Sequence, residues 1–167
     1  MTQDQIMYQT KHDQCVSLPP DTPLAVSISI IHRLHAIYLN RVLKQINLTA
    51  GQVPFLFQIA HSPGITQDEI AATAHIDKGT VARAVKKLED GGFISRTPDA
   101  LDRRRYHLSL TERGEAAIPL ITATDRAWED LITSGLSGGE RSQLYVGIRR
   151  LAANSIETIR VCGGERA

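Results

Sequence analysis

The stretch DALDRRRYHLSLTERG, residues 99–114, contains a short polar turn, an alternating strand and the start of a helix in direct succession. Three consecutive arginines, at positions 103–105, lie in or beside the turn. Residues 106–110 alternate in the way that favours a half-buried β-strand. Because residues 93–97 also read as a short strand, we expect a β-hairpin with arginines at its tip. Thr111 then has the side chain expected at a helix N-cap.

The residues just upstream, 66–92, predict two short helices joined by a tight turn. Thr66 and Glu69 have the spacing of a capping box, which marks the first helix start. Asp77 is a suitable cap for the second helix, and two glycines at positions 91–92 end it. A helix pair followed by an arginine-tipped hairpin predicts a mainly α (α+β) fold of the winged helix-turn-helix type.

Long helices are expected on both sides of this module. Apolar residues recur at three- and four-residue steps over residues 21–46, on a face too wide for the small module to cover. Two further capped helices follow over residues 113–162. We therefore expect these helices to pair two copies of the chain. The predicted organisation comprises a flexible arm at 1–20, a dimerisation helix at 21–46, a DNA-binding module at 47–112, dimerisation helices at 113–162 and a tail at 163–167.

Composition and charge narrow the class of protein. No stretch is apolar enough to span a bilayer, and the first residues lack the pattern of a signal peptide, so we expect a cytoplasmic protein. The net charge is only +1, but residues 78–113 hold nine Lys or Arg against five Asp or Glu, a local charge of +4. A basic middle between more acidic flanks is typical of a DNA-facing module on a solvated scaffold.

The second helix of the pair supplies the first set of candidate DNA contacts. When the residues expected in the core are set aside, the remaining side chains of residues 78–90 form a polar and basic face. Arg83 lies at its centre and has the geometry to bind guanine edges or two phosphates. Lysines suit phosphates because they are point charges on flexible stems. The candidates on this helix are Lys78, Thr80, Arg83, Lys86 and Lys87.

The hairpin tip supplies the second set. Three adjacent guanidinium groups repel one another and stabilise nothing locally, whereas a narrow A·T-rich minor groove attracts them. A neighbouring acid can orient one of them. The candidates here are Asp102, Arg103, Arg104 and Arg105.

Similarity to a known family is concentrated in three runs: GITQDEIA at 64–71, TVARAVKKLE at 80–89, and DRR with LSLTERG at 102–104 and 108–114. These runs resemble the MarR family of winged helix-turn-helix transcription regulators, over about residues 21–161.

The resemblance implies an obligate homodimer on a palindromic operator in double-stranded DNA, most often as a repressor. It places Arg83 where the family's recognition helix reads the major groove. It places Arg104 in the minor groove, with Asp102 steadying it. The departures are a long N-terminal arm and Gly79 in place of the commoner Ser.

The resemblance also implies a small aromatic or lipophilic effector between the dimer helices and the winged module. The candidate residues are His35, Tyr38 and Phe55. A core histidine with a polar partner is the competing interpretation of His35. No zinc-type Cys/His spacing is present, so neither a metal nor another cofactor is expected.

The sequence also bears on three alternative functions. A thiol-based redox sensor would use Cys15 and Cys162, although no basic cluster or clear helix start surrounds Cys15 to activate it. An enzyme is disfavoured because the chain has no glycine-rich phosphate loop and no nucleophile elbow. A winged helix that binds only a protein partner would be expected to lose the arginines at 103–105, which are present.

Overall fold

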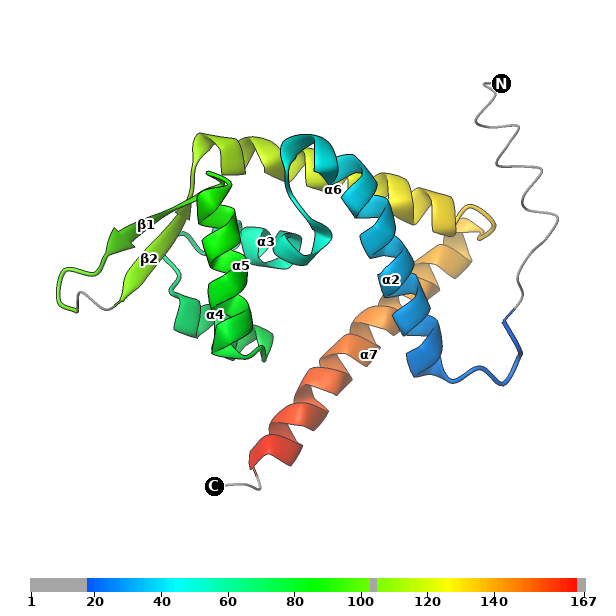
Figure 1. Ribbon diagram of the computed structural model, residues 1–167. Coiled ribbons are helices and arrows are strands. Elements are labelled where there is room, and N and C mark those ends of the chain that lie inside the picture. Colours follow the sequence, from blue (N-terminus) through cyan, green and yellow to red (C-terminus); the bar gives the residue numbers. More distant parts are fainter. Residues whose placement is uncertain (1–17, 103–104, 165–167) are drawn as a thin grey trace.

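The computed structural model describes residues 18–102 and 105–164, with the backbone alone for 162–164. Helices predominate, and one two-stranded antiparallel sheet is present in the described part (Figure 1). The predicted class, mainly α with a winged helix-turn-helix, is confirmed. In chain order, the elements are α2 (Leu24–Leu43), η1 (Lys44–Ile46), η2 (Ala50–Gln52), α3 (Val53–His61), α4 (Gln67–Ala74), α5 (Lys78–Asp90), β1 (Ile94–Pro98), β2 (Tyr106–Leu110), α6 (Glu112–Ile132) and α7 (Gly138–Gly164).

The core lies in the module formed by α3, α4, α5 and the hairpin. Its fully buried side chains include Leu56, Ile70 and Leu88. Leu39 and Leu43 from the end of α2 also belong to this core. The long first helix begins at Leu24, and its last turns pack inside the module.

The capping residues predicted from the sequence are found at the starts of both helices of the pair. Thr66 and Glu69 form the capping box at the start of α4, with both reciprocal contacts present. Asp77 accepts a hydrogen bond from the backbone N–H of Thr80 at 2.8 Å and caps α5. Between the helices, His75 takes the left-handed conformation at φ 53°, which ends α4 and turns the chain into α5.

The hairpin is confirmed, and its returning strand covers residues 106–110. The pairing runs from Ile94 with Leu110 to Pro98 with Tyr106. Next to the last of these pairs, the backbone N–H of Asp99 donates to the carbonyl of Arg105 at 3.0 Å. An isolated bridge between Ile65 and Leu108 attaches this sheet to the segment before α4.

The start of α6 is held tightly against the module. Arg113 donates to the carbonyl of Ile46 at 2.8 Å and lies 4.7 Å from the centre of the Phe93 ring. A Cβ at Gly114 would stand 2.1 Å from the carbonyl oxygen of Phe93. The helix can approach β1 this closely only because position 114 lacks a side chain.

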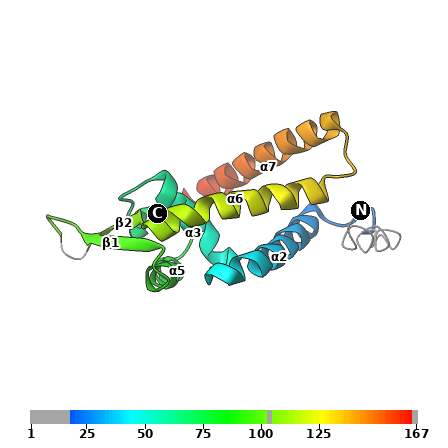
Figure 2. The same ribbon diagram turned by 90° about the horizontal axis from the view of Figure 1, so that it is seen from above.

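The long helices leave much apolar surface uncovered. Seen from above, α6 lies between α2 and α7, and α7 forms an outer layer (Figure 2). On α2, the exposed large apolar side chains are Leu24, Val26, Ile28, Ile31, Leu34 and Ile37. On α7, they are Leu144, Val146, Ile148, Leu151, Ile156, Ile159 and Val161. None of the helices in the described ranges has the length and hydropathy that a bilayer crossing requires.

Candidate nucleic-acid interface

Helix α5 has a buried face and a basic face. Val81, Val85 and Leu88 are fully buried against the core. The opposite surface exposes the four predicted cations of this helix, while Thr80 is half-buried. The helix is therefore fixed by its apolar side, which leaves its basic side open to a partner. The exposed cations are Lys78, Arg83, Lys86 and Lys87.

Arg83, at the centre of this basic face, is held by a contact with the preceding turn of the helix. Its Nη2 donates to the hydroxyl oxygen of Thr80 at 2.9 Å. The same Thr80 donates its backbone N–H to Asp77, and these contacts with Thr80 are the main reason why the pKa of Asp77 is lowered. A Cβ at Gly79 would lie 3.2 Å from Asp77 and 3.5 Å from Arg83, so the small residue leaves room for this arrangement.

Two of the lysines are paired with carboxylates. Lys78 lies 2.8 Å from Asp68 on α4, and Lys86 lies 2.6 Å from Asp90 one turn along α5. The bond and charge of Lys78 lower the pKa of Asp68, and those of Asp90 raise the pKa of Lys86. Exposed pairs of this kind contribute little stability, so a phosphate can replace the carboxylate at small cost.

The wing loop is organised by an acid that sequence reasoning missed. Asp99 Oδ1 accepts from the backbone N–H groups of Leu101 and Asp102, at 2.8 and 2.9 Å. Its Oδ2 lies 2.8 Å from the ring of His107. The local signal was available, because an Asp two or three residues before free N–H groups favours such a turn.

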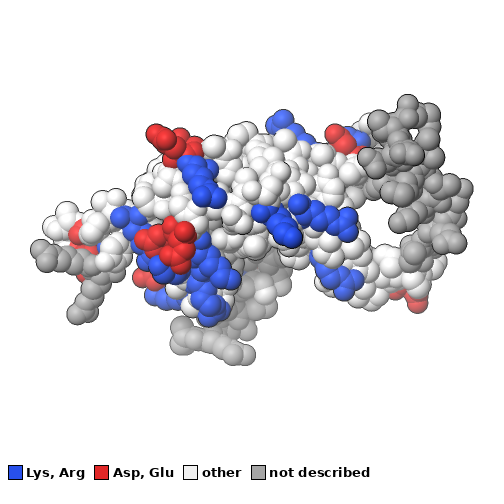
Figure 3. All heavy atoms as spheres, turned by 45° about the horizontal axis from the view of Figure 1, so that its top comes forward, with Lys and Arg blue, Asp and Glu red and all other residues white. Residues whose placement is uncertain are grey.

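The predicted wing residues are placed only in part. Asp102 and Arg105 are exposed in the loop. Arg103 and Arg104 lie outside the described residues, and so does the expected contact between Asp102 and Arg104. On the face shown in Figure 3, Lys and Arg side chains lie among acidic ones toward the winged end, and further Lys and Arg side chains are spread along the rest of the molecule.

The effector candidates separate into two groups. His35 Nε2 lies 2.9 Å from Asp125 Oδ1 on α6, and the rings of both His35 and Tyr38 lie against Trp128. Asp125 is thus the polar partner expected for His35. Phe55, by contrast, is only 5% exposed and belongs to the core of the module. Its prediction as an effector contact overlooked that the inward face of α3 includes position 55.

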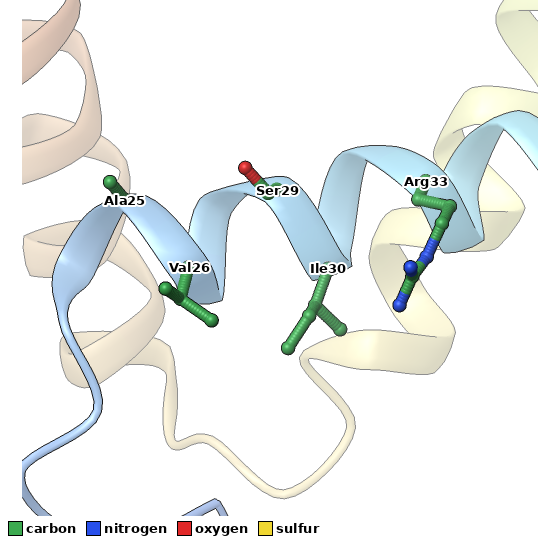
Figure 4. A pocket seen from close by; sticks show the side chains of 5 residues that line it. All are labelled: Ala25, Val26, Ser29, Ile30 and Arg33. Atoms are coloured by element: carbon green, nitrogen blue, oxygen red, sulfur yellow. The ribbon is translucent and has the colours of Figure 1, made fainter.

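An open hollow of about 520 Å³ lies beside the first half of α2. All of its lining side chains come from that one helix (Figure 4). They are Ala25, Val26, Ser29, Ile30 and Arg33. None of the three effector candidates lines it.

The two cysteines of the alternative redox sensor fall outside the side chains that the structure describes. Cys15 lies outside the described residues, and Cys162 falls in the last turn of α7, where the side chain is not described. Among the described side chains, no three of His, Cys, Asp or Glu gather as a metal ion would require.

A capped helix pair whose second helix exposes a basic face, followed by a hairpin with a charged loop, defines the winged helix-turn-helix class of DNA-binding proteins. Residues 46–105 match the model of the MarR family. Together with the relatives below, this match shows that the chain belongs to the MarR family.

The chain is 33% identical over 111 residues to the HTH-type transcriptional regulator YybA of Bacillus subtilis (strain 168), covering 66% of this chain and 74% of that protein. A crystal structure of MarR superimposes with a TM-score of 0.80 at 43% identity, covering 85% of this chain and 97% of the other. A MarR-family regulator from Listeria monocytogenes, solved in complex with a 26mer DNA, has a TM-score of 0.71 at 26% identity, covering 80% and 89%. These relatives are regulators of transcription and not enzymes.

Proposed function

We propose that this MarR-family regulator acts as a homodimer that binds a palindromic operator and represses transcription. In this proposal, α5 enters the major groove and the wing approaches the minor groove beside it. The observation that carries the proposal is the basic face of α5, with Arg83 held by Thr80 at its centre. The Listeria relative solved with DNA supports the same role for this chain.

The homodimer is supported by the apolar surface that a single chain leaves open. Ile28 and Ile31 on α2, and Ile148 and Ile159 on α7, are each half-exposed or more. Contiguous apolar surfaces of this kind mark protein interfaces. The hollow beside α2 has lining from one helix only, as expected for a surface completed by a second copy (Figure 4).

A homodimer explains why the operator should be a palindrome. Two identical reading helices related by a two-fold axis present the same side chains to two half-sites, which lie about one helical turn apart. The half-site spacing is then set by how α2, α6 and α7 hold the two modules. Any ligand that changes this spacing changes DNA affinity.

The cluster where α2 meets α6 is the place where we propose that a small aromatic or lipophilic acid binds and releases DNA. The rings of His35 and Tyr38 lie 5.7 and 5.2 Å from that of Trp128 in tilted contacts, and the side chain of His35 is 30% exposed. Aromatic rings with one accessible polar group suit a flat acidic ligand.

The deciding experiment selects bound fragments from random duplex DNA with the purified protein. A recovered inverted repeat, bound by wild-type protein and much less well by the Arg83→Ala variant, supports the proposal. Recovery of no enriched sequence would contradict sequence-specific binding. If the basic face of α5 contacts DNA phosphates, the affinity for DNA should also fall steeply as the salt concentration rises.

A further inference from the structure

His107 connects two parts of the winged module that are distant in sequence. Its Nδ1 lies 2.7 Å from the carbonyl oxygen of Gly64, in the segment between α3 and α4. Its Nε2 lies 2.8 Å from Oδ2 of Asp99, in the wing loop. The imidazole ring therefore bridges the wing to the segment that leads into the helix pair.

Both oxygens are fixed by contacts that do not involve His107. Gly64 donates its N–H to the carbonyl of Leu108 at 2.8 Å, and Leu108 donates to the carbonyl of Ile65 at 3.0 Å. Asp99 is held by the backbone N–H groups of residues 101 and 102. The two acceptors thus stay in position on either side of the ring.

The two contacts determine how many protons the ring carries. A backbone carbonyl has no proton to donate. The pKa of Asp99 is lowered to about 2, first by the backbone N–H groups of Asp102 and Leu101 and then by His107, so this carboxylate is ionised and also only accepts. Neutral imidazole has one N–H, whereas the imidazolium has two. Only the protonated ring satisfies both acceptors.

The surroundings of the ring shift the pKa of His107 in opposite directions. The carbonyl of Gly64 and the carboxylate of Asp99 raise the pKa of His107, while partial burial and Arg105 lower it, and the resulting shift is upward. The hydrogen bonds with Thr66 are the main reason why the pKa of Glu69 on α4 is lowered, and the charges of Arg105 and His107 contribute to the same shift.

We propose that His107 is a positioning residue that fixes the wing against the helix pair when its ring carries both protons, so that operator binding tightens as the pH falls. The proposal rests on the proposed function, because it requires the wing to contact DNA. His107 touches no DNA in this scheme and acts through the position of the wing loop.

The direction of the pH effect follows from the raised pKa. A histidine whose pKa in the folded protein lies above 6.5 contributes its full stabilisation below that value. The contribution is lost as the pH rises through the raised pKa. Asp99 stays ionised throughout this range, so of the two bonded side chains only His107 changes its charge.

Two measurements test the proposal. The first is a nitrogen-15 NMR titration of the imidazole in the free protein, in which we expect both ring nitrogens of His107 to be protonated near neutral pH. The second is operator affinity by fluorescence anisotropy between about pH 6 and about pH 8.5, the range over which histidine changes charge. We expect wild-type affinity to fall by about three- to tenfold across that range, as for the loss of one partly exposed charged hydrogen bond.

Three variants isolate the effect. His107→Gln carries no charge at any pH and should bind the operator weakly with a flattened pH profile. His107→Arg keeps two donors and a charge at every pH, and it should restore affinity at high pH. His32→Gln, an exposed histidine on α2, should keep the wild-type profile.

The outcomes separate this inference from the proposed function. An unchanged pH profile in His107→Gln, or a His107 ring that is neutral near pH 7 in the free protein, overturns the positioning role while operator binding stands. A doubly protonated ring in a protein that binds no duplex DNA instead overturns the proposed function, and with it the effect on binding.

Discussion

Arg83 donates a hydrogen bond from its guanidinium to the hydroxyl oxygen of Thr80, 2.9 Å away and one turn nearer the start of α5. The contact directs the guanidinium toward the beginning of the helix, which is the end that recognition helices present to base edges. Because Thr80 is itself fixed by the Asp77 cap, Arg83 has lost part of its rotamer freedom before any DNA binds. Such pre-organisation lowers the entropic cost of binding.

Replacing this arginine should reduce both affinity and discrimination. We expect Arg83→Ala to cost about 1–3 kcal/mol of operator binding and to relax selectivity at one symmetric position of each half-site. Titrations on the selected operator and on a scrambled duplex measure both effects. Lys87→Ala is the matched control, because loss of a phosphate contact should weaken both duplexes equally. Equal losses on both duplexes in Arg83→Ala would contradict a base-reading role.

The effect of replacing Arg104 in the wing should depend on the DNA sequence in a different way. We expect Arg104→Ala to weaken binding most on operators whose flanking A·T tracts narrow the minor groove, because the negative potential there is strongest. A panel of operators that differ only in those flanks measures the effect. A loss that is the same for A·T-rich and G·C-rich flanks would mean that residue 104 contacts only the phosphate backbone.

The local features of this fold were readable from the sequence, whereas the contacts between distant segments were not. The caps at Thr66, Asp77 and Thr111 depend on residues three positions away, and each was found where it was predicted. The bridge from His107 to Gly64 spans 43 positions, and the one from His35 to Asp125 spans 90. A long-range partner leaves no periodic trace in one sequence.

Because contacts between distant segments cannot be read from one sequence, the buried positions of α2 could not be predicted either. On α2, Leu39 and Leu43 are buried in the core, whereas earlier apolar residues such as Ile28 and Ile31 are about half-exposed. A wide apolar face on a long helix has two uses here, since one end enters the module core and the other stays uncovered. Only the packing of the module shows which apolar residues of α2 are buried in its core and which stay uncovered.

The close approach of α6 to β1 makes Gly114 a sensitive position for stability. A methyl group in Gly114→Ala would stand 2.1 Å from the carbonyl oxygen of Phe93, so the helix start must shift. We expect a loss of about 1–3 kcal/mol in the free energy of unfolding, as for overpacking. Gly51→Ala, which meets nothing within 4 Å, should change stability by less than about 0.5 kcal/mol. Equal denaturation midpoints for both variants would contradict the close packing.

The exposed apolar helices predict the assembly state. Light scattering at micromolar concentration should give about twice the 18.4 kDa mass of one chain. Introducing a charge on the uncovered faces, with Ile31→Glu on α2 or Ile148→Glu on α7, should shift the mass toward one chain because an unpaired carboxylate is costly to bury. Leu101→Glu alters an apolar side chain that is 99% exposed in the wing loop, and its mass should not change. A wild-type monomer that still binds the palindrome would overturn the dimer.

The last prediction concerns a ligand at the junction of α2 and α6. His35, Tyr38 and Trp128 lie together there, and the bond from His35 to Asp125 joins the two helices. A ligand shifts the regulator only if it prefers one spacing of the two reading helices, since equal affinity for both spacings changes nothing. Half-sites lie ~34 Å apart, so spreading by a few Å is enough to mismatch the two modules.

We therefore expect a small panel of aromatic acids to contain compounds that weaken operator binding in an anisotropy titration. Tyr38→Ala should blunt that response and spare the affinity measured without ligand, because the residue lies on α2, away from the basic face of α5. His32→Ala, another exposed position on α2, should respond as the wild type does. If responsive acids are found and their effect is unchanged in both Tyr38→Ala and His35→Ala, the ligand binds elsewhere on the protein and this cluster only holds α2 against α6.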